Sequence, residues 1–274
     1  MIPFAKAHAC GNDFLIVTED SAANRDFAEL TRRLCARNTG VGADGIEFFA
    51  WIGSKCGRVR LHNADGSIAE ISGNGTRCVA AWMSSMIGAK AGDELRIETD
   101  AGLRICRINN VLADGGYSVE VTTGMGIPSS ARKIVTLADG RSVEGIAVST
   151  GNPHFVIVVE DPDFSVARNA WQTIGAEICA HSDFLHQTNV EFVRILSPEE
   201  IEIRIFERGV GPTTSSGTGT SASATAAIAF HACASNLRVL SPGGAQTVSW
   251  RGPGSELELT GPATLIARGE AWCG

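Results

Sequence analysis

Alternation of apolar and polar positions predicts short strands along most of this chain. Val59 and Leu61 alternate with arginines, and Ile201, Ile203 and Ile205 alternate with charged neighbours. A period of two is typical of strands that bury one face. Further strands are expected at 4–18, broken by a turn at 9–12, and at 95–97, 104–108, 118–121, 134–137 and 143–148, with returning strands in 237–274.

Three segments have the pattern of helices instead. Phe27, Leu30 and Leu34 recur at helical spacing after a polar start at Asn24, which predicts a short amphipathic helix. Two more helices are expected after residues 72 and 216, where 79–83 and 222–230 are small or apolar nearly all round. A helix without a polar face is a buried helix. We therefore expect an α+β fold in which strands wrap around two buried helices.

The chain repeats a pair of motifs at about half its length. A Gly11-Asn12 step is followed about sixty residues later by Ser72-Gly73-Asn74-Gly75-Thr76, and Gly151-Asn152 is followed by Ser216-Gly217-Thr218-Gly219-Thr220. The steps lie 140 residues apart and the serines 144. This repeat predicts two pseudo-symmetric lobes. We place them at 1–122 and 131–274, with 122–130 as the linker and about 260–274 as candidates to return to the N-terminal lobe.

Each Ser-Gly turn opens a predicted helix, and a helix N-terminus with bare N–H groups attracts anions. Either turn alone is also an ordinary serine cap. Their duplication favours a shared role, in which two helix starts facing one cleft hold a small carboxylate. No lysine follows the glycines and no G-x-G-x-x-G follows a strand, so a P-loop and a dinucleotide fingerprint are excluded.

Composition narrows the function further. The 274 residues are 44% apolar and 19% charged, with a formal net charge of -7 and no basic stripe, which argues against nucleic acid. No apolar run is long enough for a membrane span, and the N-terminus has no secretory apolar segment, so a cytoplasmic location is expected. The eight cysteines are scattered without a C-x-x-C pair, which predicts buried thiols and no metal site.

Several polar residues at turns and strand ends could bind a zwitterion. Asparagine amides both donate and accept, and the adjacent Glu207 and Arg208 could bind an ammonium and a carboxylate. The asparagines concerned are Asn12, Asn63, Asn74, Asn152 and Asn189. Each is also a common turn former, and the Glu207-Arg208 pair could be an ordinary surface ion pair.

Six motifs in order resemble those of the diaminopimelate epimerase family over nearly the whole chain. They are Gly11-Asn12-Asp13-Phe14, Gly40-Val41-Gly42-Ala43-Asp44-Gly45, Asn63-Ala64-Asp65-Gly66-Ser67, Gly151-Asn152-Pro153-His154-Phe155, Thr188-Asn189-Val190-Glu191-Phe192 and Glu207-Arg208-Gly209-Val210-Gly211. The resemblance implies two lobes, each a strand-wrapped barrel around a central helix, with the active site in a cleft between them. It also implies catalysis without pyridoxal phosphate, metal or other cofactor, and a homodimer.

The resemblance assigns roles to the polar residues. The non-reacting end of diaminopimelate would be held by Asn63, Asn152, Asn189 and Arg208, with Glu207 and Asn12 nearby. The reacting carboxylate would lie on the N–H groups of Gly73, Asn74, Gly217 and Thr218.

The chain departs from the family pattern at the reacting groups. Family members use two cysteines, one on each face of the α-carbon, and these positions are Ser72 and Ser216 here. Pro212, Thr214 and Ser215 depart from the pattern as well. The pKa of a free thiol is about 8.5, and a helix N-terminus can lower it to near neutral. A serine hydroxyl is far more basic and needs a neighbouring base to take its proton. His154 and His62 are the candidates for that base.

Three interpretations follow. The first is an epimerase that interconverts LL- and meso-diaminopimelate by two-base 1,1-proton transfer in lysine and cell-wall biosynthesis, with Ser72 and Ser216 as the catalytic residues. The second is an isomerase or epimerase of another small carboxylic or amino acid in the same superfamily, since the run from Ser216 to Ser221 resembles proline racemases. The third is a catalytically impaired diaminopimelate-binding protein.

Overall fold

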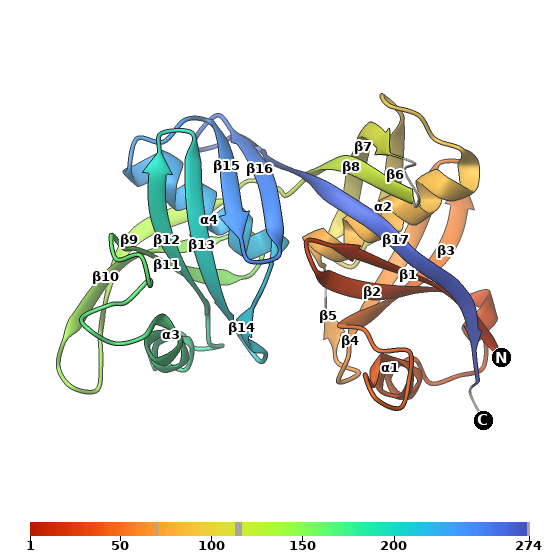
Figure 1. Cartoon of the computed structure of the whole chain (residues 1–274), viewed down its shortest axis with the longest axis horizontal. Coiled ribbons are helices and arrows are strands. Elements are labelled where there is room, and N and C mark those ends of the chain that lie inside the picture. Colours follow the sequence, from red (N-terminus) through yellow and green to blue (C-terminus); the bar gives the residue numbers. More distant parts are fainter. Residues whose placement is uncertain (70, 113–116, 273–274) are drawn as a thin grey trace. The chain divides into compact units, whose positions relative to one another are not determined.

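The structure is a computed structural model that describes residues 1–69, 71–112 and 117–272, and its strands and helices form two units (Figure 1). The first unit comprises Met1–Gly124 and Gly261–Gly274, and the second comprises Met125–Thr260. The last strand, β17 (Leu257–Ala271), contributes residues to both units. The predicted α+β, two-lobe fold is confirmed.

The strands of the first unit pair into a closed ring. They are β1 (Ile2–Ala9), β2 (Asn12–Thr18), β3 (Gly45–Gly53), β4 (Cys56–Asn63), β6 (Glu94–Thr99), β7 (Gly102–Leu112), β8 (Tyr117–Gly124) and the second part of β17. Pairing runs in this order, and the ring closes because β17 pairs with both β8 and β1. A closed barrel leaves no unpaired edge among these strands.

Helix α2 (Gly73–Ile87) is the central helix of this barrel. Its apolar residues Val79, Ala80, Ala81 and Met83 are fully buried, which confirms the prediction from the apolar run. Gly88 then ends the helix, because its left-handed backbone (φ 64°) is one that glycine adopts without strain.

The second unit repeats this plan around helix α4 (Gly217–Phe230). Its strands are β9 (Ser129–Thr136), β10 (Ser142–Ser149), β11 (Pro153–Val158), β12 (Asn189–Ser197), β13 (Glu200–Glu207), β15 (Asn236–Ser241), β16 (Gly244–Trp250) and the first part of β17. Neighbours in this series pair with one another. The two ends of the series meet where Met125 N–H donates to Leu257 O and Leu257 N–H donates to Gly126 O.

In each unit one peripheral helix connects two parallel strands. α1 (Phe27–Cys35) joins β2 to β3, and α3 (Trp171–Cys179) joins β11 to β12. Each packs on the strands that it connects, with buried residues from α1 against β3 and from α3 against β12. The short elements are η1 (Asp20–Ala22), β5 (Ile68–Ala69) and β14 (Gly211–Thr213).

Two predicted boundaries were wrong. The first amphipathic helix begins after Asp26, whose side chain accepts from Glu29 N–H, and not after Asn24. The expected linker at 122–130 is shorter, because β8 continues to Gly124 and β9 begins at Ser129. Within the described residues, no helix is long and apolar enough to cross a membrane.

Candidate functional site

Both central helices begin in the same way, at a half-buried serine. Ser72 has an extended backbone and its Oγ accepts from Gly75 N–H at 3.0 Å, while Ser216 Oγ accepts from Gly219 N–H at 3.1 Å. The first four N–H groups of a helix have no acceptor within it, and the serine satisfies only one of them. Each helix start can therefore bind an anion beside a serine hydroxyl.

In each unit the Gly-Asn step is hydrogen-bonded to this helix start. In the first unit Asn74 Nδ2 donates to Asn12 Oδ1 at 3.1 Å. In the second, Asn152 Nδ2 donates to Thr218 Oγ1 at 3.4 Å. Thr218 is the counterpart of Asn74 at the 144-residue offset, so the repeat seen in the sequence is also a repeat of contacts.

The first of these contacts is part of a charged network. Asn12 Nδ2 donates to Asp44 Oδ2 at 2.6 Å, and the fully buried Arg77 donates to Asn74 Oδ1 at 2.6 Å. The two asparagine side chains are therefore fixed between an acid and a base. Burial lowers the pKa of the Arg77 guanidinium from its ordinary value.

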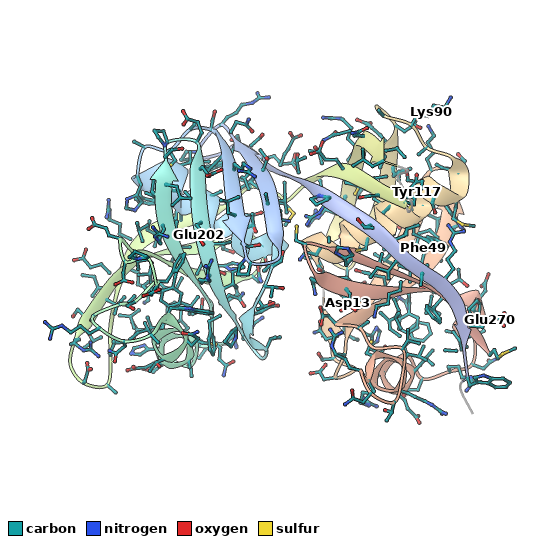
Figure 2. The ribbon with its side chains drawn as sticks, in the orientation of Figure 1. Asp13, Phe49, Lys90, Tyr117, Glu202 and Glu270 are labelled. Carbon is teal, nitrogen blue, oxygen red and sulfur yellow. The ribbon has the colours of Figure 1, made fainter. Side chains whose placement is uncertain are left out.

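The acidic end of the network continues into an ion-pair cluster beside β2. Arg37 lies 2.9 Å from Asp13 and 2.6 Å from Asp44, and Lys6 lies 2.9 Å from Asp13 (Figure 2 labels Asp13). Burial acts to raise the pKa of Asp13, but hydrogen bonds from Arg37 and Lys6 outweigh it and hold that pKa below its ordinary value. These charges fix the loop that presents Asn12.

The second helix start belongs to a longer chain of polar contacts. Ser216 Oγ lies 3.3 Å from Thr218 Oγ1, and Asn152 Oδ1 lies 2.9 Å from His154 Nε2. His154 Nδ1 lies 2.7 Å from Glu191 Oε1, with both side chains fully buried. Since Asn152 Oδ1 can only accept, Nε2 carries a hydrogen. The contact between Nδ1 and Glu191 then holds one further proton, because two lone pairs would repel each other at this distance.

Asn189 and Arg208 also lie together, at one end of the second unit. Asn189 Oδ1 accepts from Arg208 N–H at 2.9 Å, and its Nδ2 donates to Pro153 O at 3.0 Å. Asn189 therefore joins the loop after β13 to the start of β11, next to Asn152. The exposed Arg208 side chain donates to His186 O at 2.8 Å. Glu207 is the last residue of β13 and pairs with Gly211.

Asn63 lies at the end of β4 in the first unit, in the turn that the sequence predicts. Its N–H and its Nδ2 both bond to Ser67, at 2.8 Å and 3.0 Å, and its side chain is exposed. The hydrogen bond of its side chain thus stays within its own turn. The sequence pattern predicts the end of the strand at this turn, where polar residues follow the alternating ones.

Two buried glutamates behind the helix starts were missed as site residues. A methyl group built on Gly75 would lie 2.0 Å from Glu47 Oε1, and one built on Gly219 would lie 2.9 Å from Glu191 Oε1. Glu47 is 1% exposed and Glu191 is 0% exposed. Their Oε2 atoms have no hydrogen-bond partner among the described residues. The signal in the sequence was an acid at offset 144 within two apolar strand segments.

Burial has a marked effect on the protonation of these carboxyl groups. It raises the pKa of Glu47 to about 8, and the charge of Asp100 acts in the same direction. Burial also raises the pKa of Glu191, but the contact with His154 opposes it. At neutral pH, Glu47 is therefore mainly a neutral acid.

The two histidines considered as bases have different positions. His154 belongs to the network of Ser216, as described above. His62 packs edge-on against Phe27 and Phe48, and its Nδ1 has no partner in the part of the chain that the structure describes. Burial lowers the pKa of His62. Its position in this aromatic cluster does not support it as the base for Ser72.

The cysteines do not supply a replacement base at the helix starts. No disulfide joins two of the described cysteines, and Cys78 is fully buried within the apolar core around α2. Burial raises the pKa of the Cys78 thiol above its ordinary value, so it stays protonated. Cys273 lies outside the described residues.

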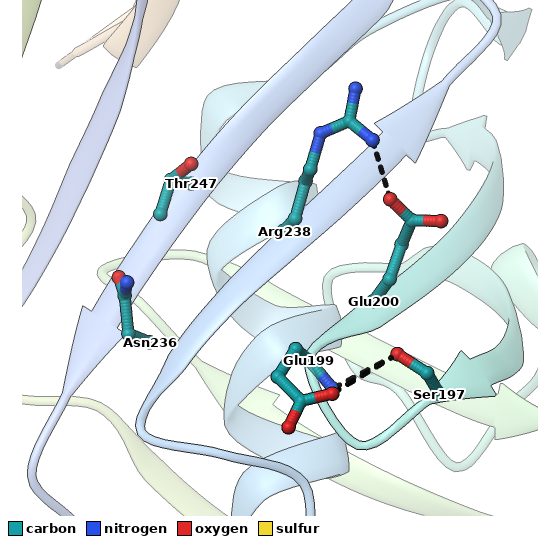
Figure 3. Close-up of a pocket in the computed structure, with 6 residues that line it drawn as sticks. All are labelled: Ser197, Glu199, Glu200, Asn236, Arg238 and Thr247. Atoms are coloured by element: carbon teal, nitrogen blue, oxygen red, sulfur yellow. Dashed lines mark hydrogen bonds and ion pairs between the residues drawn. The ribbon is translucent and has the colours of Figure 1, made fainter.

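A surface hollow in the second unit lies away from all the predicted site residues. It is lined by Ser197, Glu199, Glu200, Asn236, Arg238 and Thr247, and an ion pair joins Arg238 to Glu200 (Figure 3). A similar hollow in the first unit is lined by residues at equivalent positions, including Lys55, Cys56 and Arg96. Because the hollow recurs at the same hairpin of both units, we regard it as a consequence of the repeated fold.

Comparison with known proteins identifies relatives of this arrangement. The sequence profile described as diaminopimelate epimerase matches residues 4–127 and 146–266. A diaminopimelate epimerase of Moorella thermoacetica is 34% identical over 97% of this chain and 98% of that protein. One of Corynebacterium glutamicum is 37% identical over 98% of each chain.

Solved structures share the fold at low sequence identity. A probable proline racemase from Agrobacterium radiobacter superposes with a TM-score of 0.73 at 14% identity, covering 98% of this chain and 92% of that one. A PhzF-family phenazine biosynthesis protein from Bacillus anthracis superposes with a TM-score of 0.71 at 15% identity, covering 99% of each. At these identities the likeness concerns the fold alone.

Proposed function

Because the chain belongs to the diaminopimelate epimerase family, we propose that it inverts one α-carbon of diaminopimelate, interconverting the LL and meso forms. The reaction moves a proton from one face of the α-carbon to the other. We propose that it proceeds without pyridoxal phosphate or metal and serves lysine biosynthesis. The active form is a homodimer in this proposal, as the family resemblance implies.

One observation carries the proposal: both units present a serine-capped helix start bonded to a Gly-Asn asparagine. An anion-binding site beside a hydroxyl group, present twice, suits a reaction that needs a group on each face of a carboxylate-bearing carbon. We assign Ser72 and Ser216 to these two faces.

The reacting carboxylate lies on the N–H groups of Gly73, Asn74, Gly217 and Thr218 in this proposal. When the α-proton leaves, negative charge spreads from the α-carbon into this carboxylate. Donors already aimed at that charge stabilise the transition state without reorganising. The positive ends of the two helix dipoles act in the same direction.

The other end of the substrate carries its own ammonium and carboxylate. We propose that Arg208 binds this carboxylate, with Asn63, Asn152 and Asn189 as further ligands and with Glu207 and Asn12 nearby. The hydrogen bond from Arg208 N–H to Asn189 Oδ1 supports this, because it fixes the arginine loop beside an amide of the same set. A guanidinium bonds a carboxylate with two parallel hydrogen bonds, which gives orientation as well as affinity.

Exchange of the α-proton with solvent tests the proposal directly. LL- or meso-diaminopimelate is incubated with the protein in heavy water and followed by NMR, beside a variant with Ser72→Cys and Ser216→Cys. We expect deuterium at one α-carbon with the unaltered chain, and faster exchange with the cysteine variant because thiols ionise more easily.

The outcomes separate the three interpretations of the sequence. Exchange by the cysteine variant alone would mean a binding site without working bases, the catalytically impaired protein. No exchange by either protein would contradict the proposed substrate and favour another small carboxylic or amino acid.

A further inference from the structure

The second glycine of each Ser-Gly-x-Gly turn touches a buried carboxylate. Any side chain at Gly75 or Gly219 would meet Glu47 or Glu191, since a Cβ would lie within 3.0 Å of a carboxylate oxygen at both positions. Serine Cβ atoms lie 3.2 Å from the same two Cβ positions. Glycine at both positions thus lets a carboxylate approach the helix start beside its serine, most closely at Gly75. The arrangement occurs in both units.

Burying a carboxylate is costly, so its repeated presence among apolar neighbours needs a reason. The strand segments around Glu47 and Glu191 are otherwise apolar, and each glutamate keeps one oxygen without a partner among the described residues. A structural role would be expected to satisfy both oxygens. A group that receives and returns a proton needs one oxygen to be available.

The charges around the two glutamates differ. Besides burial, the charge of Asp100 raises the pKa of Glu47, and the charge of Glu47 in turn raises the pKa of the Cys78 thiol in α2. Glu191 faces His154. Burial raises the pKa of both glutamates, and only Glu191 has a histidine contact that acts against this rise.

We propose that Glu47 and Glu191 hold the proton for Ser72 and Ser216, so that each serine works as one half of a serine–glutamate pair. This inference rests on the proposed function. It supplies the base that a serine in place of a cysteine requires. Both glutamates act through the serines and are positioning residues, because they are buried while the serines are half-buried.

The proton moves in two balanced steps. On one side the substrate C–H bond breaks, its electron pair stays on the α-carbon, and the proton passes to serine Oγ while the serine proton passes to the glutamate. On the other side the serine O–H proton goes to the opposite face of the carbon, and the protonated glutamate replaces it on Oγ. The two glutamates exchange protonation states, and no other reactant is consumed.

The first test uses Glu47→Gln and Glu191→Gln, which keep size and remove the ability to accept a proton. With one pair disabled, the other pair can still remove a proton and return deuterium to the same face. Each variant should therefore exchange the α-proton of one diastereomer with retention of configuration, and the two variants should prefer opposite diastereomers. Epimerisation should fall about 100-fold or more in both.

Glu98→Gln is the matched control, since the same change is made on an exposed strand position of β6. It should leave both reactions unchanged. If both glutamate variants slow the two diastereomers equally, the residues support the structure only and the inference is wrong. Near-normal epimerisation by either variant would also overturn it.

The cysteine variant separates a chemical role from a structural one. With Ser72→Cys and Ser216→Cys in place, a thiolate no longer needs the glutamate, so Glu47→Gln should cost less than about tenfold there. A loss as large as in the serine protein would overturn the inference. If the cysteine variant exchanges and the unaltered chain does not, the inference fails while the proposed substrate stands. If neither exchanges, both fail.

Discussion

The two units have the same frame but different partners for the buried acid. Serine, glycine and glutamate recur at an offset of 144, but His154, which contacts Glu191, has Phe14 as its counterpart in the other Gly-Asn motif. Burial, with the charge of Asp100, raises the pKa of Glu47 to about 8. Burial raises the pKa of Glu191 as well, but the contact of its Oε1 with His154 Nδ1 opposes that rise. A single change of residue thus gives one of the two buried acids a hydrogen-bond partner.

A second difference lies on the central helices themselves. The first carries the buried Arg77, bonded to Asn74, whereas the second carries Ser221 at the equivalent position, bonded to Gly217 O. The first helix start thus has a side-chain cation bound to its asparagine, and the second has small hydroxyl groups. Duplicated folds keep their backbone frame while individual positions acquire different charges.

The largest expected effect concerns the pH dependence of stability. Folded Glu47 keeps its proton up to about pH 8, whereas the unfolded chain releases it near 4.5, so this group lowers the free energy of unfolding as pH rises between those values. At about 1.4 kcal/mol per unit, the loss approaches 4 kcal/mol from pH 5 to 8. Glu47→Gln should remove this loss, so urea denaturation should find the variant more stable at pH 8 and equal to the unaltered chain near pH 4. An unchanged pH slope would contradict the protonated state of Glu47.

The next prediction makes the second unit resemble the first. His154→Phe should cost about 3 kcal/mol at pH 8, because a buried carboxylate loses its partner. The cost should be smaller at pH 5, where Glu191 can take up a proton instead. Denaturation of the variant at the two pH values measures the difference. A cost independent of pH would show that lost packing, and not charge, causes it.

The glycines allow the two helix starts to be compared directly. Gly75→Ala should destabilise by about 2 kcal/mol, because its Cβ would lie 2.0 Å from Glu47 Oε1 in a packed core. Gly219→Ala has a milder contact of 2.9 Å, which the better helix propensity of alanine partly offsets, so its cost should stay below about 1 kcal/mol. Thermal unfolding of both variants tests the order. Adding Glu47→Ala should restore part of the stability of Gly75→Ala, and no recovery would show that the clash lies elsewhere.

The helices and strands of this molecule could largely be predicted from its sequence, but the role of its two buried glutamates could not. Periodicity located both central helices and most strands, because burial on one face or all faces determines the pattern. Glu47 and Glu191 break that pattern, and a single acid in an apolar strand has no meaning until its neighbour across the fold is known. Gly75 is 28 positions away from Glu47, and only the folding of α2 into the centre of the barrel brings them together. The helix at 171–179 could have been found, since Trp171, Ile174 and Ile178 have helical spacing.

The smallest expected effect tests what causes the raised pKa of Glu47. Burial is its main cause, and the charge of Asp100 is a second one. Asp100 is exposed, so solvent screens its charge, and Asp100→Asn should change the stability difference between pH 5 and 8 by well under 1 kcal/mol. The change should have a definite sign: with the negative charge removed, Glu47 ionises more easily and the loss of stability with pH becomes smaller. High salt should reproduce part of this effect in the unaltered chain and leave the variant unaffected. An effect as large as that of Glu47→Gln would mean that charge repulsion, and not burial, keeps the proton on Glu47.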